Sequence, residues 1–184
     1  MMKKNHLFWL KNALLLAFLV AFDQITKYLA KAHIKGQKSY TIIKNIVSFK
    51  YLPGGNTGAA WGIFSGRIIL FIIFTIFALI VIGKFIYNIY KKYKTNYSLN
   101  PTVKTLNILM IVLVAGAIGN LIDRIVNGYV IDFISFDFIK FPIFNVADCY
   151  ITVSCILLFI MCIFKVDNDT FNCVFTFKKN PEDK

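Results

Sequence analysis

The chain has 184 residues, of which 58% are hydrophobic and only 16% are charged. Soluble domains average about 45–50% apolar residues, so this composition indicates a membrane protein, small enough to form a single domain over residues 1–184. The formal net charge of +12 would suggest nucleic-acid binding in a soluble domain. Here the lysines flank apolar segments, so membrane topology and anionic lipid headgroups explain them better, and we expect no nucleic-acid partner.

Four apolar segments are long enough to cross a bilayer as helices, which takes about 20 residues each. They are approximately residues 7–29, 68–90, 106–122 and 146–164. The first one also resembles a secretory signal peptide, but the charged residues beyond its apolar core and the three further spans favour a retained helix. The sequence therefore predicts an all-α membrane protein with four transmembrane helices.

A surface segment, approximately residues 33–66, is predicted between the first two spans. Residues 39–51 are rich in β-branched and aromatic side chains, which is typical of strands. Pro53-Gly54-Gly55 then interrupts this pattern. We expect two short strands and a turn on the membrane surface, followed by a glycine-rich loop. The polar tail after Lys165 is expected to be peripheral.

Four spans place both termini on the same side of the membrane. The N-terminal segment and the short loop between the second and third spans are basic, and they carry Lys3, Lys4, Lys11, Lys91, Lys92, Lys94 and Lys104. The positive-inside rule therefore predicts that the termini are cytoplasmic. The opposite side is also basic, which weakens this charge bias.

Four of the nine acidic residues lie in or beside the spans, and they are Asp23, Asp123, Asp132 and Asp148. The alternating direction of the spans places all four at the same face of the membrane, whichever way the chain is inserted. Three asparagines accompany them, namely Asn56, Asn120 and Asn145. Their amides can hold a peptide backbone or orient a carboxylate, and Arg124 can bind a carboxylate or a phosphate.

Structural alternatives are open for two of these groups. Asp123 and Arg124 could form an interfacial ion pair that only anchors a helix end. Asp23, together with Gln24 and Lys27, could form a buried polar knot between helices. Asp132 and Asp148 have no adjacent cation in VIDF and NVAD, so a purely structural role explains them less well.

The motifs of several hydrolase classes are missing from the sequence. It contains no G-x-S-x-G, H-E-x-x-H or C-x-x-C pattern, so we expect no metal and no cofactor. Two carboxylates can hydrolyse an amide without either, because close carboxylates share one proton and can act as acid and base. On local chemistry, Asp132 and Asp148 are the best candidates for such a pair.

Five motifs in chain order closely resemble lipoprotein signal peptidase, the bacterial signal peptidase II family. They are FDQITK, GGNTGAAWG, GNLIDR, VIDF and FNVAD, and they cover residues 22–148. The resemblance implies an aspartic endopeptidase that removes signal peptides from prolipoproteins, cutting before a cysteine that carries diacylglyceryl. It also implies inhibition by globomycin. Trp61 stands where the family commonly has phenylalanine.

The resemblance assigns residues and a location. Asp132 and Asp148 would be the catalytic dyad, and the supporting residues would be Asp23, Asn56, Asn120, Asp123, Arg124 and Asn145. The enzyme would be a monomer in the bacterial cytoplasmic (inner) membrane, in contact with membrane lipid, with its active site toward the extracytoplasmic face. The alternatives are a small proton or cation transporter and a non-enzymatic membrane scaffold.

Overall fold

The computed structural model of the chain describes residues 2–58, 66–93 and 100–177. Within these ranges the chain forms five helices and three short strands. The helices are α1 (Met2–His33), α2 (Ile68–Tyr93), α3 (Pro101–Asn127), α4 (Val146–Phe164) and α5 (Asn168–Val174). The strands are β1 (Tyr40–Ile43), β2 (Val47–Phe49) and β3 (Ile134–Phe136). Residues 59–65 of the predicted surface segment, with Trp61, and Lys94 of the basic loop lie outside the described residues.

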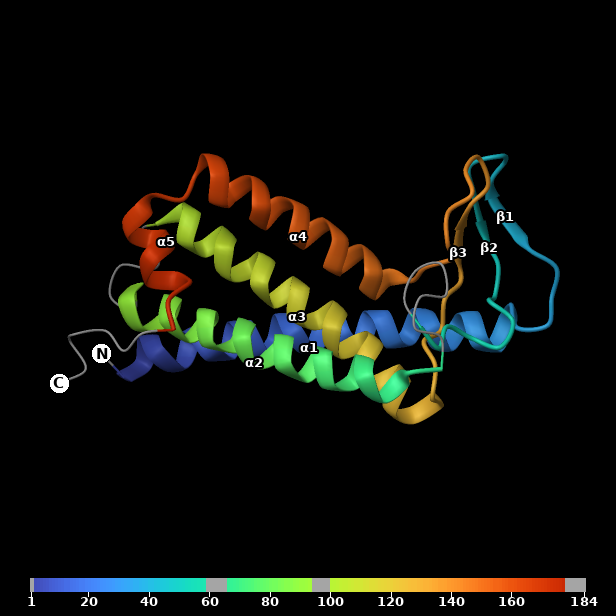
Figure 1. Ribbon diagram of the computed structural model, residues 1–184, viewed down its shortest axis with the longest axis horizontal. Coiled ribbons are helices and arrows are strands. Elements are labelled where there is room, and N and C mark those ends of the chain that lie inside the picture. Colours follow the sequence, from blue (N-terminus) through green and yellow to red (C-terminus); the bar gives the residue numbers. More distant parts are fainter. Residues whose placement is uncertain (1, 59–65, 94–99, 178–184) are drawn as a thin grey trace.

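Helices α1 to α4 lie side by side in an elongated bundle (Figure 1) and confirm the four predicted spans. Helix α3 is the most buried of the four and packs against α1, α2 and α4. It begins at Pro101, before the predicted span, because Asn100 caps it: the Asn100 side chain accepts a hydrogen bond from the backbone N–H of Val103.

Two glycines of α3 allow α4 and α1 to approach closely. A Cβ atom at Gly116 would lie 2.5 Å from the carbonyl oxygen of Ala147 in α4. A Cβ atom at Gly119 would collide with the carboxylate of Asp23 in α1. Small residues at helix interfaces are a common way to pack transmembrane helices. Here they also bring together the FDQITK motif of α1, the GNLIDR motif of α3 and the FNVAD motif at the start of α4.

The three strands form one antiparallel sheet in the order β1-β2-β3. Strands β1 and β2 confirm the two predicted strands, with Tyr40 opposite Phe49. Strand β3 comes from the linker between Asp132 and Asp148, where the sequence predicted no strand. The linker alternates apolar and polar residues over ISFDF, which is the period of a half-buried strand. Strand β3 pairs with β2 over three residues, and Ile134 also exchanges two backbone hydrogen bonds with Phe144.

The sheet lies at the end of the bundle where α1 and α3 end and α4 begins, whereas the start of α1 and α5 lie at the other end (Figure 1). The prediction of a peripheral tail was wrong for residues 168–176. Helix α5 packs on α2, and Val174 is fully buried. The side-chain amide of Asn88 donates to the carbonyl oxygens of Val174 and Thr176, both at 3.0 Å, which fixes the tail to α2.

Candidate active site

Asp132 lies in an extended segment that follows α3. Gly128 adopts a left-handed conformation at the C-terminus of α3 and turns the chain back. Val130 then exchanges two backbone hydrogen bonds with Asn56, and the backbone N–H of Leu52 donates to the carbonyl of Asp132 at 3.2 Å. The Asp132 carboxylate is 1% exposed and accepts one hydrogen bond on each oxygen, from the amide of Asn56 at 2.8 Å and from the amide of Asn145 at 2.7 Å.

Asp148 belongs to the capping box of α4. The Asn145 side chain accepts a hydrogen bond from the backbone N–H of Asp148 at 3.0 Å, and the Asp148 carboxylate accepts one from the backbone N–H of Asn145 at 3.1 Å. The second oxygen of Asp148 accepts from the amide of Asn120 at 2.8 Å. The FNVAD motif is therefore a helix N-terminus that fixes the rotamer of its own aspartate.

Asn145 connects the two carboxylates. Its oxygen caps α4 beside Asp148, while its amide nitrogen donates to Asp132 and, at 3.1 Å, to the Asn120 oxygen. Asn120 in turn donates to Asp148. Both amides are almost completely buried, so their orientations are set by these partners.

A cavity of about 420 Å³ contains both carboxylates in its wall. Asn56, Asn120 and Arg124 contribute further polar groups. The remaining wall is mostly apolar and includes Val130, Phe136, Phe141, Pro142, Ile143, Phe144, Cys149 and Val153. A few convergent polar groups in an otherwise apolar cavity are typical of an active site.

Lys27 of α1 lies at the centre of a buried ion cluster beneath this cavity. Its ammonium nitrogen is 2.9 Å from the Asp23 carboxylate, 3.2 Å from the Asp123 carboxylate and 2.9 Å from the Asn120 oxygen. Gln24 adds hydrogen bonds to both carboxylates. The polar knot that the sequence left open for Asp23 is therefore present, and Asp123 is a member of it.

The alternative ion pair between Asp123 and Arg124 is not formed, because Asp123 turns inward to Lys27. Arg124 instead places its guanidinium 5.0 Å from the ring centroid of Phe71 and donates to the backbone carbonyl of Asn120 at 3.4 Å. Arg124 therefore lines the same cavity as the two candidate carboxylates.

The two aspartates of this cluster each hold the backbone next to a candidate catalytic residue. Asp23 accepts a hydrogen bond from the backbone N–H of Ala147, beside Asp148, at 2.9 Å. Asp123 accepts one from the backbone N–H of Ile131, beside Asp132, at 3.0 Å. Lys27 was not among the site residues predicted from the sequence. The spacing of Asp23 and Lys27, four residues apart on one helix, was the available signal.

The buried environment of Asp132 raises the pKa of its carboxyl group to about 7. Burial makes the largest contribution, and the negative charge of Asp148 adds to it. Hydrogen bonds from Asn56 and Asn145 and the positive charge of Lys27 act in the opposite direction. A carboxyl group with a pKa near neutrality can act as a general acid or a general base.

Comparisons with known proteins give a consistent result. The profile of the family described as Signal peptidase (SPase) II matches residues 15–164. The lipoprotein signal peptidase of Lactobacillus gasseri is 40% identical over 150 residues, which are 82% of this chain and 90% of the relative. That of Caldanaerobacter subterraneus is 40% identical over 152 residues, or 82% of this chain and 94% of the relative.

Two solved structures are also similar to this chain. A bacterial membrane enzyme structure, obtained by the in meso method, is similar with a TM-score of 0.67 and 34% sequence identity, covering 92% of this chain and 94% of that chain. A second structure with the same description has a TM-score of 0.68 and covers 85% of this chain. The membrane-enzyme fold is therefore shared over nearly the whole chain.

Proposed function

Because this chain belongs to the signal peptidase II family and cleaves the signal peptides of prolipoproteins, we propose that it does so as an aspartic endopeptidase with Asp132 and Asp148 as its catalytic pair. The observation that carries this proposal is that both carboxylates line one cavity while Asn145 contacts both residues. The raised pKa of Asp132 supports it further, since one proton can then reside on the pair near neutral pH.

The proposed mechanism divides the work between the two carboxyl groups. The ionised carboxylate removes a proton from a water molecule, which attacks the carbonyl carbon of the scissile peptide bond. The protonated carboxyl group donates its proton to the carbonyl oxygen, which gives a tetrahedral gem-diol. When the carbon–nitrogen bond then breaks, the first carboxyl group passes the proton it took from water to the leaving amine, and the second regains a proton from a hydroxyl of the gem-diol. Titration belongs to the pair as a unit. Asn56, Asn120 and Asn145 hold the carboxylates in place, and the Lys27 cluster fixes their flanking backbone.

The proposed substrate carries a diacylglyceryl group on the cysteine that follows the cleaved bond. The phenylalanines and Pro142 of the cavity wall offer an apolar surface to such a substrate at the end of the bundle. We further propose a monomer in the bacterial cytoplasmic membrane, with cytoplasmic termini and the cavity at the extracytoplasmic face. The start of α4 and strand β3, which contribute to the cavity wall, lie at the opposite end of the bundle from the start of α1 (Figure 1), as this orientation requires. The transporter alternative finds no support among the relatives.

Cleavage of one prolipoprotein, with and without its diacylglyceryl group, by the purified enzyme in detergent tests this proposal. We expect product from the lipidated form only, and none from Asp132→Asn or Asp148→Asn. Asp137→Asn is the matched control, because Asp137 is an acid of the same loop that pairs with Lys50 outside the cavity. Wild-type turnover by either active-site variant would refute the assignment of the pair.

A further inference from the structure

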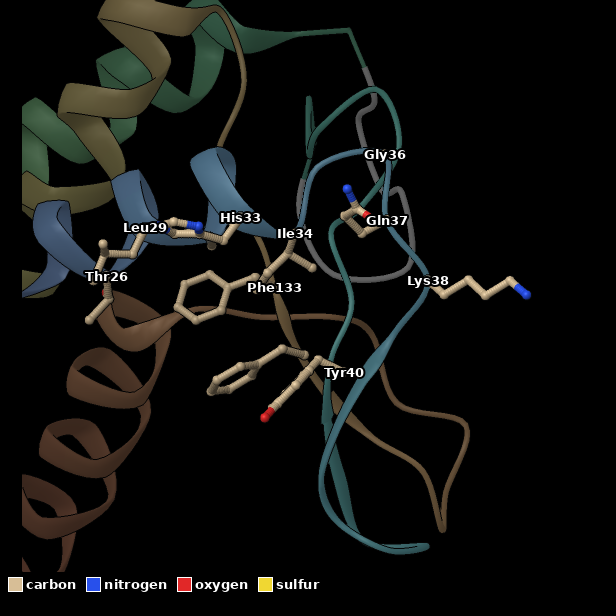
Figure 2. Close-up of a pocket in the computed structure, with 11 residues that line it drawn as sticks. Thr26, Leu29, His33, Ile34, Gly36, Gln37, Lys38, Tyr40 and Phe133 are labelled. Atoms are coloured by element: carbon tan, nitrogen blue, oxygen red, sulfur yellow. The ribbon is translucent and has the colours of Figure 1, made fainter.

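A second cavity of about 860 Å³ lies between the last turns of α1 and the sheet (Figure 2). Its apolar wall includes Leu29, Ala30 and Ile34 from the end of α1, and Tyr40, Phe49 and Phe133 from the sheet side. Ligand cavities have volumes of about 300–1,000 Å³ and are mostly apolar. In size and lining, this cavity can therefore accept a hydrocarbon chain.

This cavity is separate from the candidate active site. The two cavities share no lining residue. The extended segment with Asp132 and Phe133 separates the two cavities. Asp132 lines the catalytic cavity, and its neighbour Phe133 lines the second one. Successive side chains of an extended segment point in opposite directions, which explains how one short segment lines both.

The second cavity lies where the first transmembrane helix reaches the membrane boundary. The span of α1 ends at His33, which lines the cavity. Leu29 and Tyr40, on opposite walls, are 47% and 67% exposed, so the cavity is open to its surroundings at both. Figure 2 shows the rings of Tyr40 and Phe133 turned to the side on which Leu29 and Thr26 lie, whereas Lys38 extends away from the cavity. A bilayer whose boundary lies near His33 would place acyl chains beside the apolar wall and headgroups near Lys38.

The stretch of chain that supplies most of the cavity wall carries only positive charges. No acidic residue occurs between Asp23 and Asp123. Lys27 and Lys50 in this stretch pair with aspartates. Lys35, Lys38 and Lys44 have no acidic partner among the residues that the structure describes. A basic residue near a membrane surface contributes about 1 kcal/mol to the attraction of anionic lipid.

We propose that the second cavity binds an anionic phospholipid. One acyl chain lies between Leu29 and the rings of Phe49 and Phe133, and the phosphate lies near Lys38 at the mouth. Burial of each methylene group favours binding, while the unpaired lysines provide the preference for a negative headgroup. Binding goes beyond the proposed peptidase function and does not depend on it, since it is measured without turnover.

Native mass spectrometry of the purified protein in detergent tests the proposal, with phosphatidylglycerol as the anionic probe and phosphatidylcholine as the neutral one. We expect wild-type protein to retain phosphatidylglycerol in preference. Leu29→Trp fills the cavity and should abolish this retention, while Lys38→Gln should weaken phosphatidylglycerol binding about fivefold, the effect of one basic residue. Thermal melting verifies that each variant is folded.

Two matched controls separate the cavity from the rest of the surface. Ile25→Trp adds the same side chain to an exposed position of α1 that does not line the cavity, and Lys44→Gln removes a lysine of the same basic stretch outside the lining. Both should bind phosphatidylglycerol as the wild type does. Equal retention of the two lipids, or undiminished binding by folded Leu29→Trp, would overturn the proposal. Displacement of phosphatidylglycerol by a peptide bearing a diacylglyceryl cysteine would also overturn it, because the cavity would then hold the substrate's own lipid.

Discussion

The side-chain amide of Asn145 donates a hydrogen bond to the carboxylate of Asp132 at 2.7 Å. Asn145 is the N-cap of α4, whereas Asp132 lies in the extended segment that follows α3. The same asparagine caps α4 in front of Asp148. One residue therefore caps a transmembrane helix and contacts both candidate catalytic residues. Its roles in capping and in catalysis can be separated by mutation.

Asn145→Ala should cost about 1 kcal/mol of capping energy and abolish most of the cleavage activity. Asn100→Ala is the matched control, because Asn100 caps α3 in the same way but lies away from the cavity. We expect both variants to lose a few degrees of thermal stability in detergent, and only Asn145→Ala to lose turnover of the lipidated substrate. A parallel loss of activity in Asn100→Ala would reduce the role of Asn145 to capping.

The pH dependence of cleavage should follow Asp132. With its pKa near 7, turnover should fall as the pH rises through neutrality, because the pair loses its shared proton. Asn56→Leu removes a hydrogen bond that stabilises the ionised form of Asp132. The alkaline limb of the rate profile should therefore move upward by up to about one pH unit. Initial rates from pH 5 to pH 9 measure this shift, and a downward shift would contradict the assignment.

Stability should respond to pH through the same group. The pKa of Asp132 is higher in the folded protein than the ordinary value of 3.8, so the folded state binds more protons than the unfolded state between about pH 4 and pH 7. Stability is lost as the pH rises through this window. Asp132→Asn removes the buried charge and should raise the melting temperature by about 5 °C or more at pH 8, and by much less at pH 5. Equal shifts at the two pH values would argue against a raised pKa.

Lys27 is expected to be the most sensitive position of the buried ion cluster. Lys27→Met leaves the carboxylates of Asp23 and Asp123 without their shared cation, which should cost about 3–5 kcal/mol. The double variant Asp23→Asn/Lys27→Met should recover part of this loss, since one uncompensated charge is removed. Thermal melting in detergent measures both variants. Lys31→Met serves as control, because Lys31 donates to Asn127 and belongs to no such cluster; a loss as large as that of Lys27→Met would indicate a nonspecific effect.

Gly119 is expected to tolerate no side chain. Gly119→Ala would press a methyl group against the Asp23 carboxylate and displace α1 from α3. We expect a marked loss of both melting temperature and cleavage. Gly83→Ala in α2 is the matched control, because a Cβ atom there meets nothing within 4 Å, so higher helix propensity should leave it unchanged or stabilise it by up to about 1 kcal/mol. Wild-type behaviour of Gly119→Ala would show that the helices can separate without consequence.

Several features of this protein could be predicted from the sequence because they depend on local chemistry. Long apolar runs specify spans wherever a bilayer is present, and the alternating direction of those spans places Asp23, Asp123 and Asp148 at one end of the bundle. The β-branched and aromatic run before Pro53 specified β1 and β2. The candidate site residues were recognised individually, since charged side chains near hydrocarbon are costly.

The tertiary structure decided which of these groups are partners. Asp123 pairs with Lys27 across two helices rather than with its neighbour Arg124, because Gly119 of α3 allows α1 to approach closely and the charge is neutralised inside the bundle. Strand β3 pairs with β2, which is distant in the sequence, and with Phe144. The number of residues between two positions in the sequence does not reveal whether they are in contact. Close packing of distant segments brought Asp132 and Asp148 to one cavity and left a second cavity on the other side of the same segment.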